Sequence, residues 1–167
     1  EELVAVRRDL HQHPELSWQE ERTARRVVEF LDRYGIDHRA GVAETGIVAE
    51  LPGLDADAPI VALRADLDAL PIQEETGLPF ASVHDGCMHA CGHDAHTSML
   101  LGAAVLLTRG APLLAPVRLI FQPAEERGQG AKTMIEAGVL EGVGLIFGGH
   151  VDRHFPSGTI AVTDGPV

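Results

Sequence analysis

The sequence predicts an α/β protein: a three-layer α/β/α sandwich with a largely parallel, mixed central sheet, in one domain. Short apolar runs at 60–65, 117–121 and 145–147 are typical of buried strands. Helical stretches at 93–108 and 131–137 alternate with these runs, as expected where helices join parallel strands. Polar residues follow each run, and open α/β sheets bind their ligands at these carboxyl ends of the strands.

Two helices are expected before the first strand. Apolar residues at helical spacing favour a helix over residues 2–13, which Pro14 ends. Residues 17–20, Ser-Trp-Gln-Glu, form a capping box and predict a second helix, which Gly35 ends. A strand over residues 45–51 follows. We interpret the helix pair as a packing element.

The segments outside the repeated strand and helix pattern give weaker signals. The loop 72–89 is long, and loops of this length without secondary structure often line a functional site. A short apolar run at 160–162 predicts an edge strand.

The composition excludes several classes of function. The formal net charge is −12, from 13 basic and 25 acidic residues, whereas nucleic acid or an anionic membrane requires a basic surface. The longest apolar stretch, 99–107, is shorter than the ~20 residues that span a bilayer. With no visible signal peptide, we expect a cytoplasmic protein. A disulfide between Cys87 and Cys91 is disfavoured, because so short a loop gains little from closure.

The densest cluster of reactive side chains lies at residues 88–96, Met-His-Ala-Cys-Gly-His-Asp-Ala-His. Nitrogen and sulfur donors at this density suit Zn²⁺ or a similar divalent transition metal. We expect Cys91 and His93 to be ligands, with a helix N-terminus and the metal both lowering the pKa of the thiol. His89 and His96 are candidates for orienting the ligands.

Alternatives stay open for this cluster. Cys91 and His93 could be a buried cysteine and a helix-capping histidine. Cys91 could also be a nucleophile with a histidine base, a hypothesis that ranks lower because it leaves the downstream acids unexplained. Asp94 could hold a histidine ring or cap the helix, and capping is the favoured role.

Two adjacent carboxylates, Glu125 and Glu126, follow the apolar run 117–121. Because neighbouring residues that leave a strand point different ways, one carboxylate can coordinate a metal while the other acts as a general base. The alternative is an ordinary solvated acidic loop.

His150 follows the run 145–147 after two glycines, which leave backbone room near a ligand. A hydrogen-bonded core histidine is the alternative. Asp66 and Asp68 follow the run 60–65, where either could orient a ligand or cap the turn. Five other histidines carry no signal and are expected in loops or on the surface: His11, His13, His38, His84 and His154.

Five segments in order along the chain resemble the di-metal amidohydrolases and peptidases of the aminoacylase and carboxypeptidase family. The resemblance is to the branch of hippurate hydrolases, N-acyl-L-amino-acid amidohydrolases and auxin-conjugate hydrolases. The matching segments are 7–16, 65–72, 88–96, 122–126 and 150–159.

The resemblance implies a site with two divalent metal ions, Zn, Mn, Co or Ni. Cys91, His93, Glu126 and His150 would be ligands, with the Cys91 thiolate bridging the ions. Glu125 would be the general base that activates the attacking water. The implied substrate is an N-acyl amino acid, with an acetyl, benzoyl or similar acyl group, or a small peptide-like amide.

The resemblance places Asp66 behind the ligands, as the acid of a position that other branches write as His-x-Asp. Here Arg64 replaces that histidine, which shifts ligation toward Cys91 and His93. The segment 150–154 also differs from the commoner version of this motif, which contains proline.

The resemblance further implies that residues 1–167 are the N-terminal part of the metal-dependent catalytic domain. A dimerisation (lid) domain would follow a segment like 165–167, and the C-terminal part of the catalytic domain would follow that. These parts would supply the last metal ligand, a lid histidine and a homodimer interface. The alternative hypothesis is a non-catalytic metal-binding or structural fragment, and the 167 residues alone are expected to be inactive.

Overall fold

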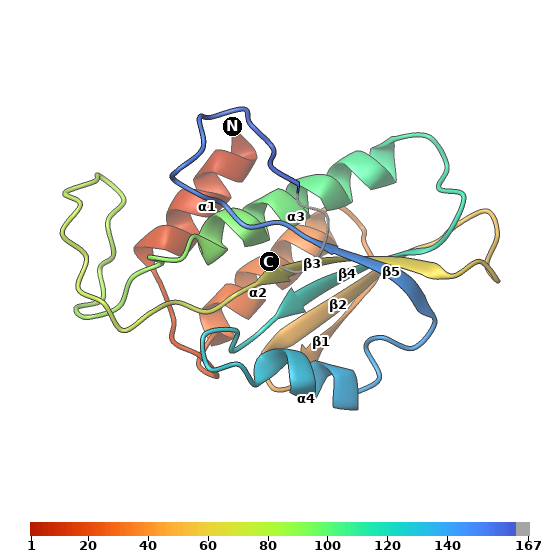
Figure 1. Cartoon of the computed structure of the whole chain (residues 1–167), viewed down its shortest axis with the longest axis horizontal. Helices are drawn as coiled ribbons and strands as arrows, with labels where there is room; N and C mark the ends of the chain where they lie inside the picture. Colours follow the sequence, from red (N-terminus) through yellow and green to blue (C-terminus); the bar gives the residue numbers. More distant parts are fainter. Residues whose placement is uncertain (163–167) are drawn as a thin grey trace.

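The computed structural model describes residues 1–162 as a five-stranded open sheet with helices on both faces (Figure 1). The strand order is β1-β2-β4-β3-β5. Along the chain the elements are α1 (Glu2–Gln12), α2 (Glu21–Arg33), β1 (His38–Val42), β2 (Gly46–Leu51), β3 (Ile60–Asp66), α3 (His93–Arg109), β4 (Val117–Gln122), α4 (Gly130–Glu136) and β5 (Val143–Gly148). The segment 165–167, after which an inserted domain is expected, lies outside the described residues.

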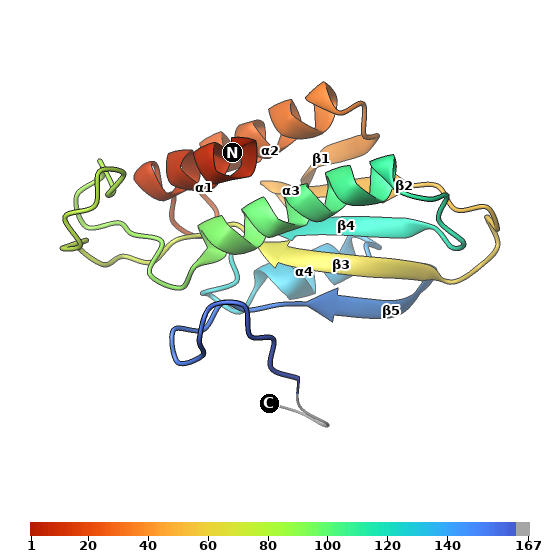
Figure 2. The same cartoon turned by 90° about the horizontal axis from the view of Figure 1, so that it is seen from above.

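The sheet is mixed but largely parallel, as predicted. β3 pairs in parallel with β4 and with β5, while β2 pairs antiparallel with β1 and with β4, so β2 alone runs in the opposite direction. The arrowheads of β3 and β5 in Figure 2 point to the edge at which α3 begins. The ends of three strands and the start of a helix therefore meet at one edge, which is where open α/β sheets place their ligands.

Each face of the sheet has its own apolar core. On one face, Leu119 and Phe121 of β4 pack with Leu101 of α3 and with residues of α1 and α2. On the other face, Ile120 packs with Met134 of α4. This alternation follows from the two-residue period of a strand, and each fully buried large side chain contributes about 1.5–3 kcal/mol. The three-layer sandwich is confirmed.

The predicted capping box is wrong. α2 begins at Glu21, and the Ser17 hydroxyl donates to the buried carboxylate of Asp68 at 2.6 Å. The first amides of α2 are instead bonded by Glu15, which accepts from the backbone N–H of Arg22 at 3.0 Å and of Thr23 at 2.7 Å. A charged acceptor forms a stronger hydrogen bond than a neutral one. The Ser17 hydroxyl and the first amides of α2 therefore each bond to a carboxylate rather than to one another.

Three expectations about strands also differ from the structure. β1 was not predicted, because only Val42 of its five residues is buried and no apolar run marks it. Residues 160–162 form no strand. β5 is an edge strand rather than a core strand, and its Leu145, Ile146 and Phe147 side chains are each more than half exposed. Among residues 1–162, no helix is long and apolar enough to cross a membrane.

Candidate metal centre

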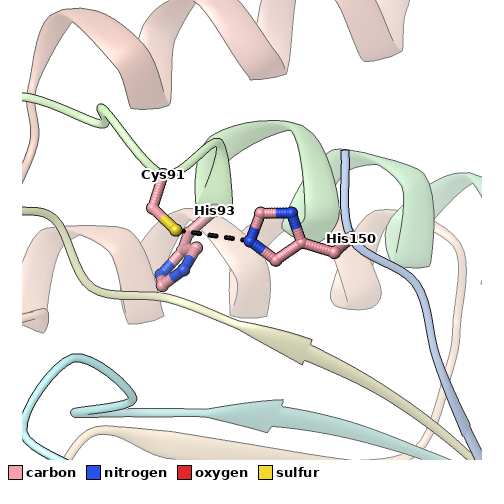
Figure 3. A group of neighbouring side chains, drawn as sticks. All are labelled: Cys91, His93 and His150. Carbon is pink, nitrogen blue, oxygen red and sulfur yellow. Dashed lines mark hydrogen bonds between the residues drawn. The ribbon is translucent and has the colours of Figure 1, made fainter. Parts of the chain in front are cut away.

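Ligand-type side chains from four parts of the chain converge at the carboxyl edge of the sheet. Three overlapping groups have candidate ligand atoms that all lie within 4.8 Å of one another: Cys91, His93 and His150; His93, Glu125 and Glu126; and Asp66, His93 and His96. His93 belongs to all three groups. Figure 3 shows Cys91 and His93 at the start of α3, with the His150 ring reaching toward them from the segment after β5.

The turn before α3 brings Cys91 and His93 to the same site. Gly92 between them has φ +84°, a left-handed conformation that favours glycine. A Cβ atom at Gly92 would also lie 2.4 Å from a methyl group of Val151. Glycine is therefore required twice, for the backbone conformation and for the close packing of Val151. Opposite this turn, the Cys91 sulfur lies 3.3 Å from Nε2 of His150.

His93 lies at the centre of the cluster and is 1% exposed. Its Nδ1 lies 3.3 Å from Asp68, and its Nε2 lies 3.7 Å from Glu126 and 3.8 Å from Glu125. Among residues 1–162, neither ring nitrogen has a hydrogen-bond partner. Burial lowers the pKa of His93, but the carboxylates of Asp68, Asp66 and Glu126 outweigh it and raise the pKa above its ordinary value. A buried imidazole without partners is costly, and a cation at Nε2 would satisfy it.

The two adjacent glutamates differ in their surroundings. The Glu126 side chain is 21% exposed, and its Oε1 atom is buried without a hydrogen-bond partner. The Glu125 side chain is 39% exposed. Both carboxylates therefore face the buried histidine, and Glu125 is the more accessible to solvent.

Buried acids hold the turn that carries the glutamates. The Asp68 carboxylate accepts the backbone N–H groups of Glu125 and Glu126, each at 3.0 Å. Glu20 accepts the N–H of Ala124 at 2.8 Å. Burial raises the pKa of Asp68, but hydrogen bonds from His93, Ser17 and the two amides outweigh burial. The net effect lowers the pKa to about 2. Asp68 is thus ionised at neutral pH. It also lies closer to His93 than Asp66 does, because the Asp66 carboxylate is 3.7 Å from His93 Nδ1.

The pKa of the Cys91 thiol is raised in the metal-free chain, whereas a lowered pKa was expected. Burial raises its pKa to about 11, and the negative charge of Glu126 contributes in the same direction. The helix N-terminus does not compensate, because carboxylates surround the sulfur. The thiol is therefore protonated at neutral pH in the absence of a cation, and metal binding would release its proton. Both cysteines are free, so the disfavoured disulfide is absent.

A second buried cluster lies behind the turn and was only partly expected. Asp94 does not cap α3: its carboxylate accepts from His11 Nδ1 at 2.8 Å and pairs with Arg7 Nε at 2.7 Å. His11 was expected at the surface but is 4% exposed. The loop that was expected to line the site contacts this cluster, through Glu74 at 3.2 Å from His11. The spacing of Arg7 and His11 by four residues, which places them on one helix face, was the signal that could have found the cluster.

His89 is buried without a hydrogen bond at either ring nitrogen. Burial lowers its pKa to about 4, so the ring is neutral. Within the part of the chain that the structure describes, His89 belongs to none of the ligand groups.

Comparisons with known proteins identify the family of the chain. The family model for Peptidase family M20/M25/M40 matches residues 62–165. An N-acetylcysteine deacetylase of Bacillus subtilis is 52% identical over 167 residues, which cover 99% of this chain and 44% of the relative. The IAA-amino acid hydrolase ILR1-like 5 of Arabidopsis thaliana is 49% identical over 98% of this chain and 37% of the relative. The chain thus spans less than half the length of these relatives.

Solved structures show the same architecture. A dinuclear metal binding peptidase of the M20 family from Bacillus subtilis superposes with a TM-score of 0.95 and 51% identity, covering 99% of this chain and 47% of that one. Human carnosine dipeptidase 1 shares the fold alone, with a TM-score of 0.67 and 17% identity over 90% of this chain and 38% of that one. The resemblance drawn from the five segments is therefore confirmed, and the chain belongs to Peptidase family M20/M25/M40.

Proposed function

We propose that this chain carries the metal site of an amidohydrolase that cleaves the amide bond of N-acyl amino acids or small peptide-like amides. The observation that supports this most is the convergence of the Cys91 thiol, the imidazoles of His93 and His150 and the Glu126 carboxylate. Both ring nitrogens of His93 and Oε1 of Glu126 lack hydrogen-bond partners among residues 1–162. Relatives named as an N-acetylcysteine deacetylase and as hydrolases of IAA-amino acids support the substrate class.

The proposed ligands are Cys91, His93, Glu126 and His150, which together hold two divalent cations. A sulfur, nitrogen and carboxylate donor set suits Zn, and also Mn, Co or Ni. The orphaned atoms of His93 and Glu126 support the assignment, because a cation would satisfy them. The dinuclear metal site named for the structural relative supports the number of ions. When bound, the metals would polarise the scissile carbonyl and lower the pKa of the attacking water.

The proposed general base is Glu125. Its greater exposure leaves it free to meet the substrate, while its backbone is fixed by Asp68. Glu125 takes a proton from the attacking water and delivers it to the leaving amine nitrogen. Asp68 orients His93, and Asp66 supports the site from behind.

We also propose that the chain is the N-terminal part of a longer catalytic domain, with a separate dimerisation domain. The exposed Leu145, Ile146 and Phe147 side chains of β5 support this, because so many large apolar groups on one strand favour coverage by further residues. The greater length of the relatives is consistent with it. A homodimer and a cytoplasmic location stay predictions, and the alternative is a metal-binding fragment without turnover.

The test is hydrolysis of N-acetyl- and N-benzoyl-amino acids by the full-length protein with Mn²⁺, Zn²⁺ or Co²⁺. Glu125→Gln should lower kcat by a factor of about 10²–10⁴, the usual contribution of a general base, with an unchanged metal content. Glu75→Gln, at an exposed glutamate outside the site, is the matched control. A Glu125→Gln enzyme that keeps its rate would remove the base assignment. Strong activity of the 167 residues alone would show that the proposed further domain is not needed.

A further inference from the structure

We propose that His96 is a positioning residue that fixes His150 in the metal site through the backbone of Val151. The inference deepens the proposed function and rests on it, since His150 matters here as a ligand. It explains how the chain holds His150, which follows the edge strand β5 and lies outside the sheet. The sequence already made His96 a candidate for orienting the ligands, and the contacts of its ring identify the ligand that it positions.

The hydrogen bonds of His96 determine its tautomer. The ring is 3% exposed and lies on α3 one turn after His93. Its Nε2 lies 2.9 Å from the backbone N–H of Val151, which can only donate, so Nε2 must be the unprotonated acceptor. The proton therefore sits on Nδ1, which donates to Asp66 at 2.6 Å. His96 is a neutral ring with both nitrogens engaged.

Val151 passes this constraint on to His150. The Nδ1–H of His150 donates to the carbonyl oxygen of Val151 at 2.7 Å, and its Nε2 lies 3.3 Å from the Cys91 sulfur. The Val151 side chain packs over Gly92, where no Cβ would fit. The ring centroids of His96 and His150 also lie 4.6 Å apart in an edge-to-face arrangement. Three contacts thus dock the segment onto the turn that carries Cys91.

The far end of this chain of contacts is anchored in the sheet. Asp66 at the end of β3 pairs with Arg64 at 2.7 Å, and Arg64 donates to Gln122 of β4 at 2.9 Å. His150 itself is exposed and follows an exposed edge strand. The hydrogen bond from Val151 to His96 is therefore the polar link between His150 and the central strands.

A direct role of His96 as a metal ligand is the competing explanation, because Asp66, His93 and His96 form one of the three ligand-type groups. The hydrogen bonds separate the two roles. Both nitrogens of His93 lack partners, whereas both nitrogens of His96 have them. A ligand needs a free lone pair, so the geometry assigns ligation to His93 and positioning to His96.

Two variants of the full-length protein isolate the contact. In His96→Asn the amide can still donate to Asp66 but is too short to reach Val151. In His96→Gln the longer side chain can present an oxygen to the N–H of Val151. His96→Asn should weaken Co²⁺ affinity about 10–100-fold, the usual effect of losing a partner behind a ligand. His96→Gln should bind Co²⁺ at least about fivefold more tightly than His96→Asn does. His84→Asn, at an exposed histidine outside the site, is the control.

The readouts are Co²⁺ titration followed by its absorption spectrum, and ¹⁵N NMR of histidine in the metal-free protein. NMR should show the Nδ1–H tautomer for the resonance that disappears in the His96 variants. Equal affinities in wild type and His96→Asn, equal losses in both variants, or an Nε2–H tautomer would each overturn the proposal. The tautomer itself is measured in the wild-type protein, and the variants serve to assign its resonance. A wild-type protein that binds Co²⁺ but hydrolyses no amide would remove the proposed function and leave this inference standing.

Discussion

On the inner side of the candidate metal centre the functional side chains come from buried elements of the fold, whereas the outer side depends on one histidine beyond an exposed strand. The inner side consists of β3, β4 and the first turn of α3, with Asp68, His93 and Glu126. The outer side consists of β5 and residues 149–162, with His150. Inner residues are mostly buried, and those of the outer side are almost all exposed.

The comparison indicates that the two sides acquire their geometry in different ways. Folding of the apolar core fixes the inner side, because Asp68 and Glu20 bind the glutamate turn within that core. The outer side has little apolar burial of its own. His150, its proposed ligand, is placed by hydrogen bonds and by the packing of Val151 on Gly92. Stability and metal affinity should therefore respond differently to mutations on the two sides.

The largest expected contrast comes from one phenylalanine on each side. Phe121 of β4 is fully buried, and Phe121→Ala should lower the free energy of unfolding by about 3–5 kcal/mol. Phe147 of β5 is 56% exposed, and Phe147→Ala should cost less than about 0.5 kcal/mol in the 167-residue chain. Urea unfolding of both variants measures the difference. Similar costs would show that the outer side is not peripheral, while a larger cost of Phe147→Ala in the full-length protein would support coverage of β5 by further residues.

The next effect tests the buried acid of the inner side. The two carboxylate oxygens of Asp68 each accept one backbone N–H group. Asp68→Asn replaces one of these oxygens with an NH₂ group that cannot accept, and should destabilise the protein by about 2 kcal/mol. The folded-state pKa of Asp68 is lowered to about 2 from 3.8. Its contribution is therefore complete above about pH 4 and is lost as the pH falls through about 2.

The stability difference between wild type and Asp68→Asn should shrink over the same pH range. Unfolding by urea at pH 7, 4, 3 and 2.5 checks this, with the exposed Asp57→Asn as control. A difference that stays constant from pH 7 to pH 2.5 would contradict the charged role of Asp68.

The smallest effect on stability, with a clear effect on the metal, is expected for Gly92→Ala. Gly77 also has a positive φ, +66°, but a Cβ there meets nothing within 4 Å. Both substitutions should therefore cost about 1–2 kcal/mol from the backbone conformation. Only Gly92→Ala pushes Val151 away, so only this variant should also lose Co²⁺ affinity. Equal affinities of the two variants would show that the packing of Val151 does not hold the outer side.

The sequence predicted the sheet and the convergence of ligand types, because both depend on local patterns. Apolar runs identified β3 and β4, and the residues after them lie at one edge. The partners of Ser17, Glu20 and His11 could not be found in this way, because they lie 51, 104 and 83 residues away. Glu20 was assigned to a local capping box, yet it holds the glutamate turn across the fold.

The exposure of β5 was missed for a related reason. Its apolar run has the composition of a core strand, and the sequence does not reveal which strand lies at an edge. The raised pKa of Cys91 was missed because its main cause, burial of the thiol, and the nearby carboxylates both depend on distant parts of the chain.

The central claim is that Cys91, His93, Glu126 and His150 hold the metals, and cobalt substitution of the full-length protein tests it most directly. Metal analysis should find two equivalents, and the absorption spectrum should contain a thiolate-to-cobalt band. Cys91→Ser should lose that band, while Cys87→Ser, at the buried cysteine that bonds to Pro14, should keep it. A wild-type protein without the band, or a band that survives in Cys91→Ser, would contradict the account.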